Sequence, residues 1–184
     1  LRIHSVESHD DPIITDWVDF ISNEYEVPNG VDDVLILLPC SARKPYSSSK
    51  SHKSFRRAIN HTSAHELMVT SPMGIVPRDL EEVWPAGHYD IPVTGDWTND
   101  EVERVTMMLD SLISRSNYRV IINHSGLDYK SSIPVIDTRG GQSATNNEAL
   151  GRLENAVAEH MQSRKRTGEK INLDNFRSVA RLHH

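Results

Sequence analysis

The sequence predicts an α/β fold, a three-layer sandwich with a mostly parallel central sheet. Residues 34–38 and 120–122 are apolar at every position, as strands buried on both faces are. Segments with apolar residues at helical spacing alternate with these runs along the chain. Because strands alternate with helices, we expect parallel strands with helices covering both faces of the sheet.

The N-terminal half is predicted to hold two helices and two strands. Pro12 suits the first turn of the first helix, Pro39 ends the first strand, and Ser51 is the predicted N-cap of the second helix. In chain order, the predicted elements are a helix over 12–24, a strand over 34–38, a loop over 39–51, a helix reaching Asn60, and a strand over 66–70.

The C-terminal half continues the alternation. Thr98 and Glu101 form a capping box, and Pro92 indicates an edge or irregular strand. In chain order, the predicted elements are a loop over 71–78, a helical turn over 79–83, a strand over 89–94, a helix over 98–115, strands over 118–123 and 134–137, a helix from 146 or 147 to 164, and a last helix over 173–182.

The 184 residues are predicted to form one domain over 1–165, followed by a helical tail or the start of a linker over 166–184. Leu1 stands where a start methionine would, which indicates a chain cut from something longer. The single cysteine, Cys40, excludes an intrachain disulfide and fits a reducing cytoplasm. Because no apolar run is long enough to cross a bilayer, a cytoplasmic protein without a membrane partner is expected.

The charge is unevenly distributed. The net charge of −6, from 20 Lys+Arg and 26 Asp+Glu, argues by itself against a general nucleic-acid binder. However, residues 41–65 include no acidic residue. The basic residues there are Arg43, Lys44, Lys50, Lys53, Arg56 and Arg57. This segment is either a solvated helix face or a surface that binds phosphates.

Three loops, over 39–51, 71–78 and 123–130, each follow a predicted strand and are expected to share the rim where ligands bind in such folds. In the first loop, nearby positive charge and a helix N-terminus would lower the pKa of Cys40 and favour its thiolate. His52 would then act as its base. The alternative is that Cys40 is an inert buried thiol.

Other candidates are less specific. Tyr89 could stack on a base and Asp90 could accept a hydrogen bond from a base edge or an amine, or both could be structural. The residues 71–81 either fix a backbone path near a ligand or form a plain turn, and His124 could lie on the same rim. One Cys and ten scattered His lack metal-ligand spacing, and no phosphate-binding glycine motif occurs, so neither metal nor cofactor is expected.

The loop carries a complete motif that resembles the signature of the archaeosine synthase family, archaeal relatives of tRNA-guanine transglycosylase. The pattern is Pro-Cys, three residues, Lys-Pro-Tyr, two residues, Ser, two residues and His. Its positions here are Pro39, Cys40, Lys44, Pro45, Tyr46, Ser49 and His52. Residues 70–81 and 88–97 also resemble that family, and the resemblance extends over about residues 10–165.

The resemblance implies a uracil-DNA glycosylase-like fold and an enzyme of archaeosine biosynthesis in tRNA modification. The family adds the amine of free lysine to the nitrile of 7-cyano-7-deazaguanine, held at position 15 of archaeal tRNA, and a radical-SAM lyase partner cleaves the lysine adduct. Full members carry a transglycosylase-like domain before this region and an RNA-binding PUA domain after it. Neither fits in 184 residues, so we expect a core domain or one piece of a split enzyme.

On this resemblance, Cys40 or its loop holds the nitrile, Lys44 and Tyr46 polarise or protonate its nitrogen, and His52 moves protons. The expected substrate-binding residues are Pro39, Ser41, Pro45, Ser49, Tyr89 and Asp90, with Asp90 on the amino-acid ammonium. The expected RNA-binding residues are Arg43, Lys50, Lys53, Arg56 and Arg57.

Two hypotheses of another class stay open. The chain could be a non-catalytic tRNA-binding or partner-docking module of the same modification enzyme, with the chemistry elsewhere. It could also be a DNA-repair glycosylase, which only fold analogy suggests.

Overall fold

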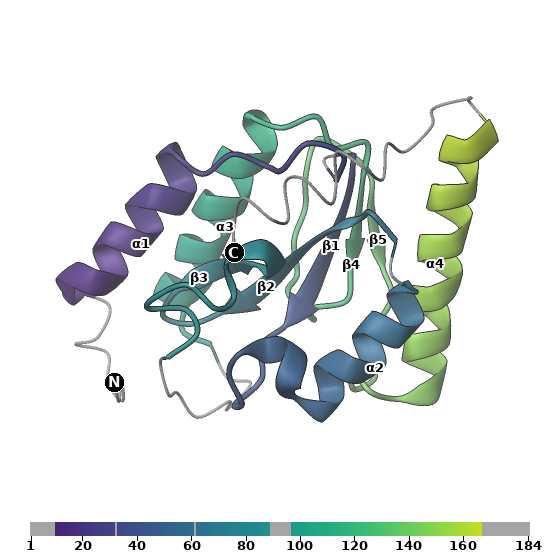
Figure 1. Cartoon of the computed structure of the whole chain (residues 1–184), viewed down its shortest axis with the longest axis horizontal. Helices are drawn as coiled ribbons and strands as arrows, with labels where there is room; N and C mark the ends of the chain where they lie inside the picture. Colours follow the sequence, from purple (N-terminus) through teal and green to yellow (C-terminus); the bar gives the residue numbers. More distant parts are fainter. Residues whose placement is uncertain (1–9, 32, 61, 89–96, 167–184) are drawn as a thin grey trace.

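The computed structural model describes residues 10–31, 33–60, 62–88 and 97–166, and these form a five-stranded sheet between two layers of helices (Figure 1). The strand order is β3-β2-β1-β4-β5. Neighbours pair in parallel except β2 and β3, which are antiparallel. The strands are β1 (Val34–Pro39), β2 (His65–Thr70), β3 (Gly74–Pro77), β4 (Val120–Asn123) and β5 (Val135–Asp137). The predicted α/β fold with a mostly parallel sheet is therefore confirmed.

The helices cover both faces of the sheet, as predicted. Helices α1 (Pro12–Asn23) and α3 (Asn99–Ser114) lie on one face, and α2 (Lys50–Ile59) and α4 (Asn147–Arg166) lie on the other (Figure 1). Because side chains alternate along a strand, Leu35 and Leu37 of β1 pack with α1 and α3. Val34, Ile36 and Leu38 pack with α2 and α4. The uninterrupted apolar run of β1 thus contributes side chains to the hydrophobic cores on both faces of the sheet.

One predicted loop is a strand. Residues 71–78 were expected to be irregular because of their prolines and glycine, but Gly74–Pro77 forms the edge strand β3. Gly74 has φ +83°, which lets the chain reverse after β2 in a backbone conformation that favours glycine. The indole Nε1 of Trp17 donates to the carbonyl of Ile75 at 3.0 Å, so a helix side chain covers part of this edge. The helical turn expected next is the short 3-10 segment η3 (Arg78–Leu80).

The remaining predicted elements agree with the structure, or lie outside the described residues. The helices expected over 12–24 and 98–115 and the strands over 118–123 and 134–137 are confirmed, with ends differing by one or two residues. The strand over 89–94 and the helix over 173–182 lie outside the described residues, as does the tail from 167. Helix α4 is described to Arg166, and the domain boundary expected after 165 stays a prediction.

Candidate functional site

The loops after β1, β2 and β4 meet at one edge of the sheet. Pro39 of β1 lies beside Val69 of β2, and Leu37 of β1 lies beside Asn123 of β4. Directly after β4, the amide of His124 donates to the carbonyl of Leu37 at 2.8 Å. The parallel register therefore places the carboxyl ends of these strands together, as predicted, and the loop over 39–51 lies between the other two.

This loop, which we call the signature loop (residues 39–52), passes through a short 3-10 segment, η2 (Tyr46–Ser48), into α2. Ser49 is the N-cap of α2, because its hydroxyl accepts from the amide of His52 at 3.2 Å. The hydroxyl also donates to the carbonyl of Tyr46 at 2.8 Å. The prediction of Ser51 as the cap was wrong, since Ser51 lies inside the first helical turn. Ser49 thus fixes where α2 begins within the signature loop.

Lys44 and Tyr46 form a packed pair. Tyr46 is fully buried in the core on the α1 and α3 side. The Lys44 ammonium lies 4.7 Å from the centre of the Tyr46 ring and donates to the carbonyl of Ser41. The Tyr46 ring is thus part of the core, and its action on a nitrile stays a prediction. Lys44 is half-buried, and its ammonium remains close enough to act on the electrostatics of Cys40.

Cys40 follows β1 directly and is half-buried. Burial raises the pKa of its thiol, and this outweighs the opposing effects of the Lys44 ammonium and a hydrogen bond with the Thr70 side chain. The prediction that positive charge would favour the thiolate was therefore wrong, because desolvation of the sulfur is the larger effect. At neutral pH Cys40 is a protonated thiol.

His52 is a clamp between the strand end and the rest of the site. Its Nε2 lies 2.8 Å from the carbonyl oxygen of Pro39, and its Nδ1 lies 2.9 Å from Nη2 of Arg78. Burial, together with the Arg78 guanidinium, lowers the pKa of His52 to about 3. The His52 ring is fully buried and has a hydrogen-bond partner at both nitrogens, and its movement of protons stays a prediction.

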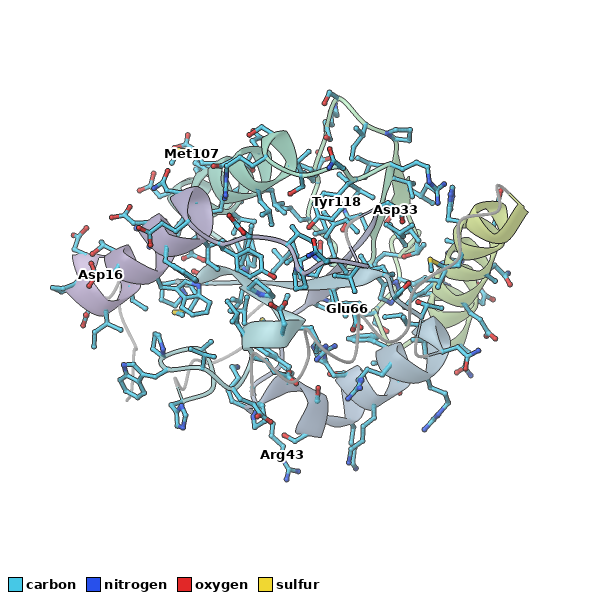
Figure 2. All side chains as sticks on the ribbon, turned by 45° about the horizontal axis from the view of Figure 1, so that its top comes forward. Asp16, Asp33, Arg43, Glu66, Met107 and Tyr118 are labelled. Carbon is cyan, nitrogen blue, oxygen red and sulfur yellow. The ribbon has the colours of Figure 1, made fainter. Side chains whose placement is uncertain are left out.

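Arg78 holds together the signature loop, α2, β2 and η3. Its guanidinium donates to Glu66 from Nε at 3.1 Å and from Nη2 at 2.9 Å. It donates to the Ser47 hydroxyl at 3.2 Å and to Glu81 at 3.1 Å, both from Nη1. Glu81 in turn accepts from the amide of Ser47 at 3.1 Å and from its hydroxyl. Glu66, labelled near the centre of the view in Figure 2, has a side chain that is only 13% exposed.

Sequence reasoning included Arg78 and Glu81 only within the candidate segment 71–81, without a role for either, and missed Glu66. Their spacing was a further signal, since Arg78 and Glu81 lie three residues apart in a predicted helical turn. His124, by contrast, was expected on the rim. It does follow β4, but it is fully buried and bonds to Thr138 at 2.7 Å and to the carbonyl of Ala144 at 2.8 Å. It therefore joins the ends of β4 and β5 to the approach to α4.

A basic surface lies on the signature loop and the outer side of α2. Its members are all exposed, and within the described part of the chain none forms an ion pair: Arg43, Lys50, Lys53, Arg56 and Arg57. Figure 2 shows Arg43 and Asp16 projecting from different sides of the molecule. Asp16 and Asp19 are the two acidic residues of α1 and both are exposed, whereas α2 has no acidic residue.

The remaining predicted site residues are only partly described. Ser41 is buried and Pro45 is half-buried in the signature loop, whereas Tyr89 and Asp90 lie outside the described residues. Over the described ranges, no group of three or more His, Cys, Asp and Glu side chains could hold a metal ion. In the same ranges, no helix combines the length and apolar character needed to cross a membrane.

An open concavity of about 970 Å³ lies along the β5 edge, between the loop that follows β4 and the loop that precedes α4. Its lining includes Asn123 at the end of β4, Lys130 and Arg139. Asn123 is bonded within its own turn, to the carbonyl of Leu127 at 2.7 Å. The guanidinium of Arg139 is bonded to the carbonyl of Gln142 at 2.7 Å. The side chains of Asn123 and Arg139 therefore stabilise the loops that line the concavity.

These features define a class of protein: a three-layer α/β domain whose central strand ends in a cysteine-bearing loop held by a buried ion cluster. The chain belongs to the family described as Domain of unknown function (DUF5591), which matches residues 14–157.

The chain is similar to curated archaeal proteins. The archaeosine synthase subunit alpha of Methanosarcina acetivorans is 43% identical over 136 residues, which cover 68% of this chain and 22% of that protein. The archaeosine synthase of Haloferax volcanii is 45% identical over 124 residues, covering 67% of this chain and 21% of that protein. The resemblance to archaeosine synthase predicted from the signature loop is confirmed. The chain spans about a fifth of the length of these curated relatives.

A solved structure supports the fold. The crystal structure of AF0587, a protein of unknown function, superposes with a TM-score of 0.59 and 23% sequence identity, over 77% of this chain and 49% of that one. At this identity the likeness concerns the α/β architecture alone.

Proposed function

We propose that this chain is the core domain of an archaeosine synthase and acts in tRNA modification at the signature loop. The observation that carries the proposal is the position of that loop. The complete motif leaves the central strand β1 at the rim of strand ends, with Cys40 and Lys44 beside each other. The relatives named archaeosine synthase support the same role. The domain limits 1–165 and a uracil-DNA glycosylase-like fold belong to the same proposal.

The proposed reaction is the addition of the lysine amine to the nitrile of 7-cyano-7-deazaguanine in tRNA. The amine nitrogen forms a bond to the nitrile carbon, one π bond of the C≡N group breaks, and a proton from the amine passes to the nitrile nitrogen. The product is an amidine. It retains every atom of the amine and the nitrile, so the addition has no leaving group and needs no oxidant. The task of the protein is to orient the amine and to stabilise the negative charge that develops on the nitrile nitrogen.

Cys40 and Lys44 are the groups that we propose for this task. A protonated thiol can add across a nitrile, with sulfur bonding to carbon and the thiol proton going to nitrogen, which gives a thioimidate. The lysine amine then adds to the thioimidate carbon, the C–S bond breaks, and one amine proton passes to sulfur, which restores the Cys40 thiol and leaves the amidine. Because burial raises the pKa of the thiol, its proton must leave sulfur as the S–C bond forms, and the nitrile nitrogen accepts it. The Lys44 ammonium would stabilise the charged nitrogen.

We propose that Pro39, Ser41, Pro45 and Ser49 shape the pocket around the nitrile through the loop backbone. Tyr89 and Asp90 are proposed to contact the base and the amino-acid ammonium. The basic surface would hold the tRNA backbone. Transglycosylase-like and PUA domains, on this or another chain, would add tRNA affinity, and a radical-SAM lyase would consume the adduct.

A non-catalytic tRNA-binding module is the second candidate function. The observation that favours it is the basic surface, which has five exposed cations and lies on one helix and the loop before it. On this alternative, replacing Lys50, Lys53 or Arg56 weakens RNA binding and reduces its salt dependence, whereas replacing Cys40 changes nothing.

Mass spectrometry distinguishes the two. Cyano-modified tRNA is incubated with lysine and this chain, with and without the transglycosylase-like and PUA domains, and the mass of the modified nucleoside is measured. The wild type is expected to add one lysine, and C40A to lose at least about a hundredfold in rate. An unchanged rate in C40A would contradict a covalent role for Cys40. A wild type that binds the tRNA but gives no adduct in either format favours the binding module.

A further inference from the structure

We propose that Arg78 is a positioning residue for the signature loop, because it anchors the His52 ring at Nδ1 and thereby holds the peptide that precedes Cys40. The inference deepens the proposed function, on which its relevance to catalysis rests. Its physical content, however, concerns a thiol and an imidazole that can be measured without any tRNA.

All five N–H groups of the Arg78 guanidinium are used. The Nε group and one Nη2 group point to Glu66, the two Nη1 groups point to Ser47 and Glu81, and the second Nη2 group points to His52. The side chains of Arg78, Glu66 and Glu81 are only 15%, 13% and 10% exposed. A guanidinium with every donor engaged in a nearly buried cluster has one orientation available.

This orientation fits one tautomer of neutral His52. An arginine donates hydrogen bonds and cannot accept them, so the ring nitrogen that faces it, Nδ1, must be the unprotonated acceptor. The proton of the neutral ring then resides on Nε2, which lies 2.8 Å from the carbonyl oxygen of Pro39 and donates to it. The carbonyl can only accept and requires the same tautomer, so the ring is held at both nitrogens. Without Arg78, the Pro39 contact alone holds the ring.

The carbonyl of Pro39 belongs to the peptide bond that joins it to Cys40. A hydrogen bond to this oxygen therefore fixes the end of β1 against α2, directly before the thiol. The second connection from Arg78 reaches the same loop farther along, at Ser47. Arg78, which directly follows β3, thus contacts the signature loop at two points, His52 and Ser47.

The double variant R78M/E66Q removes Arg78 without leaving two carboxylates without a cation. R78M alone leaves Glu66 and Glu81 facing each other without a cation, so the domain could lose its fold. In R78M/E66Q the formal charge of the cluster stays at minus one, and Glu81 keeps its two hydrogen bonds from Ser47. E66Q alone and R115M serve as controls, since Arg115 also ties two elements together, by bonds of 2.9 Å to the carbonyls of Ile21 and Tyr25.

The first readout is the hydrogen bonding of the His52 ring, measured from imidazole ¹⁵N chemical shifts in the full chain. The wild type, E66Q and R115M are expected to show a protonated Nε2 and a hydrogen-bonded, unprotonated Nδ1. R78M/E66Q is expected to keep the proton on Nε2 but to shift the Nδ1 signal, because the hydrogen bond from Arg78 is gone. An Nδ1 signal unchanged from that of E66Q in a folded R78M/E66Q chain would overturn the proposal.

The second readout is the rate at which iodoacetamide alkylates Cys40, the single cysteine of the chain. We expect R78M/E66Q to react at least about threefold faster than E66Q, because a released loop exposes the thiol, and threefold exceeds the usual error of additivity. In a H52Q background the glutamine amide donates to Pro39 whatever its neighbour, so the same change should alter the rate by less than twofold. Equal effects in both backgrounds would mean that Arg78 does not act through His52.

These measurements are independent of the proposed reaction. If the wild type forms no lysine adduct but the imidazole and alkylation results hold, the proposed function fails and the role of Arg78 in positioning stands. If adduct forms and R78M/E66Q leaves the Nδ1 signal, alkylation and adduct rate unchanged, the positioning role fails alone.

Discussion

Removing Arg78 by R78M tests how much the buried ion cluster contributes to stability. The substitution keeps an unbranched side chain of similar length but deletes all five donors, and it leaves Glu66 and Glu81 unpaired at 13% and 10% exposure. Breaking a buried ion pair on one side typically costs about 3–5 kcal/mol, because the remaining charge is desolvated without compensation. For a domain whose total stability is of the order of 5–15 kcal/mol, this is a large fraction.

Urea unfolding followed by circular dichroism measures the effect. With a slope of about 2 kcal/mol per M, R78M should lower the unfolding midpoint by about 1.5–2.5 M. R78K should fall between R78M and the wild type, because an ammonium keeps the charge but has three donors in place of five. The double variant R78M/E66Q should recover part of the loss, since one of the stranded carboxylates is neutralised.

A midpoint shift below about 0.5 M for R78M, with an unchanged slope, would refute this reasoning. It would mean that the two carboxylates find water or other partners without cost, and that the cluster is not held together by the guanidinium. R115M is the matched control, because it removes an exposed arginine whose acceptors are backbone carbonyls and leaves no carboxylate behind.

Four further predictions follow from single features of the site. The pKa of His52, lowered to about 3, lies below its unfolded value near 6.5, so its contribution is present above about pH 6.5 and is lost as pH falls toward 3. H52Q should therefore flatten the decline of the urea midpoint over that window. The pKa of Cys40 is raised by burial, so its alkylation at pH 8 should be slower than that of the urea-unfolded chain and should accelerate up to a higher pH than for a free thiol. S49A should cost about 1 kcal/mol in urea unfolding, through loss of the N-cap of α2. K53E should weaken tRNA binding, measured by filter binding, and should reduce the slope of log affinity against log salt by about one.

Matched controls exist for two of these. S51A leaves the cap of α2 in place and should change the midpoint by less than half as much as S49A. K130E makes the same charge change on the loop after β4, away from the basic surface, so a loss of binding equal to that of K53E would indicate a general charge effect.

The α/β fold was predicted correctly from the patterns of apolar residues along the chain, because these patterns reflect which faces of each element are buried. The run from Val34 to Leu38 is apolar at every position because β1 is buried on both faces, and this alone indicated a covered parallel sheet. The one wrong element, residues 71–78, shows the limit of such patterns. Prolines and a glycine are typical of loops, yet an edge strand tolerates them because one side needs no ladder hydrogen bonds.

The chemistry of the site was predicted less well, because it depends on a balance of opposing effects. The sequence placed Lys44 near Cys40 correctly, and that charge does act to lower the pKa of the thiol. Burial acts in the opposite direction and is larger, and the degree of burial is decided by the whole fold. The contribution of Tyr89 and Asp90 stays a prediction.

The sequence by itself determined the α/β architecture, the rim of strand ends, the signature loop on that rim and the family to which it belongs. These depend on local periodicity and on residues that are close along the chain. Only the tertiary structure decided that His52 is a neutral clamp and that Arg78 holds it. These two residues are 26 positions apart, and their contact at 2.9 Å forms because β3 folds back beside β2 and brings η3 to the signature loop. A hydrogen bond between distant residues produces no periodic pattern in a single sequence. The direction of the pKa shift of Cys40 and the contacts of His52 can therefore be read only from the folded chain.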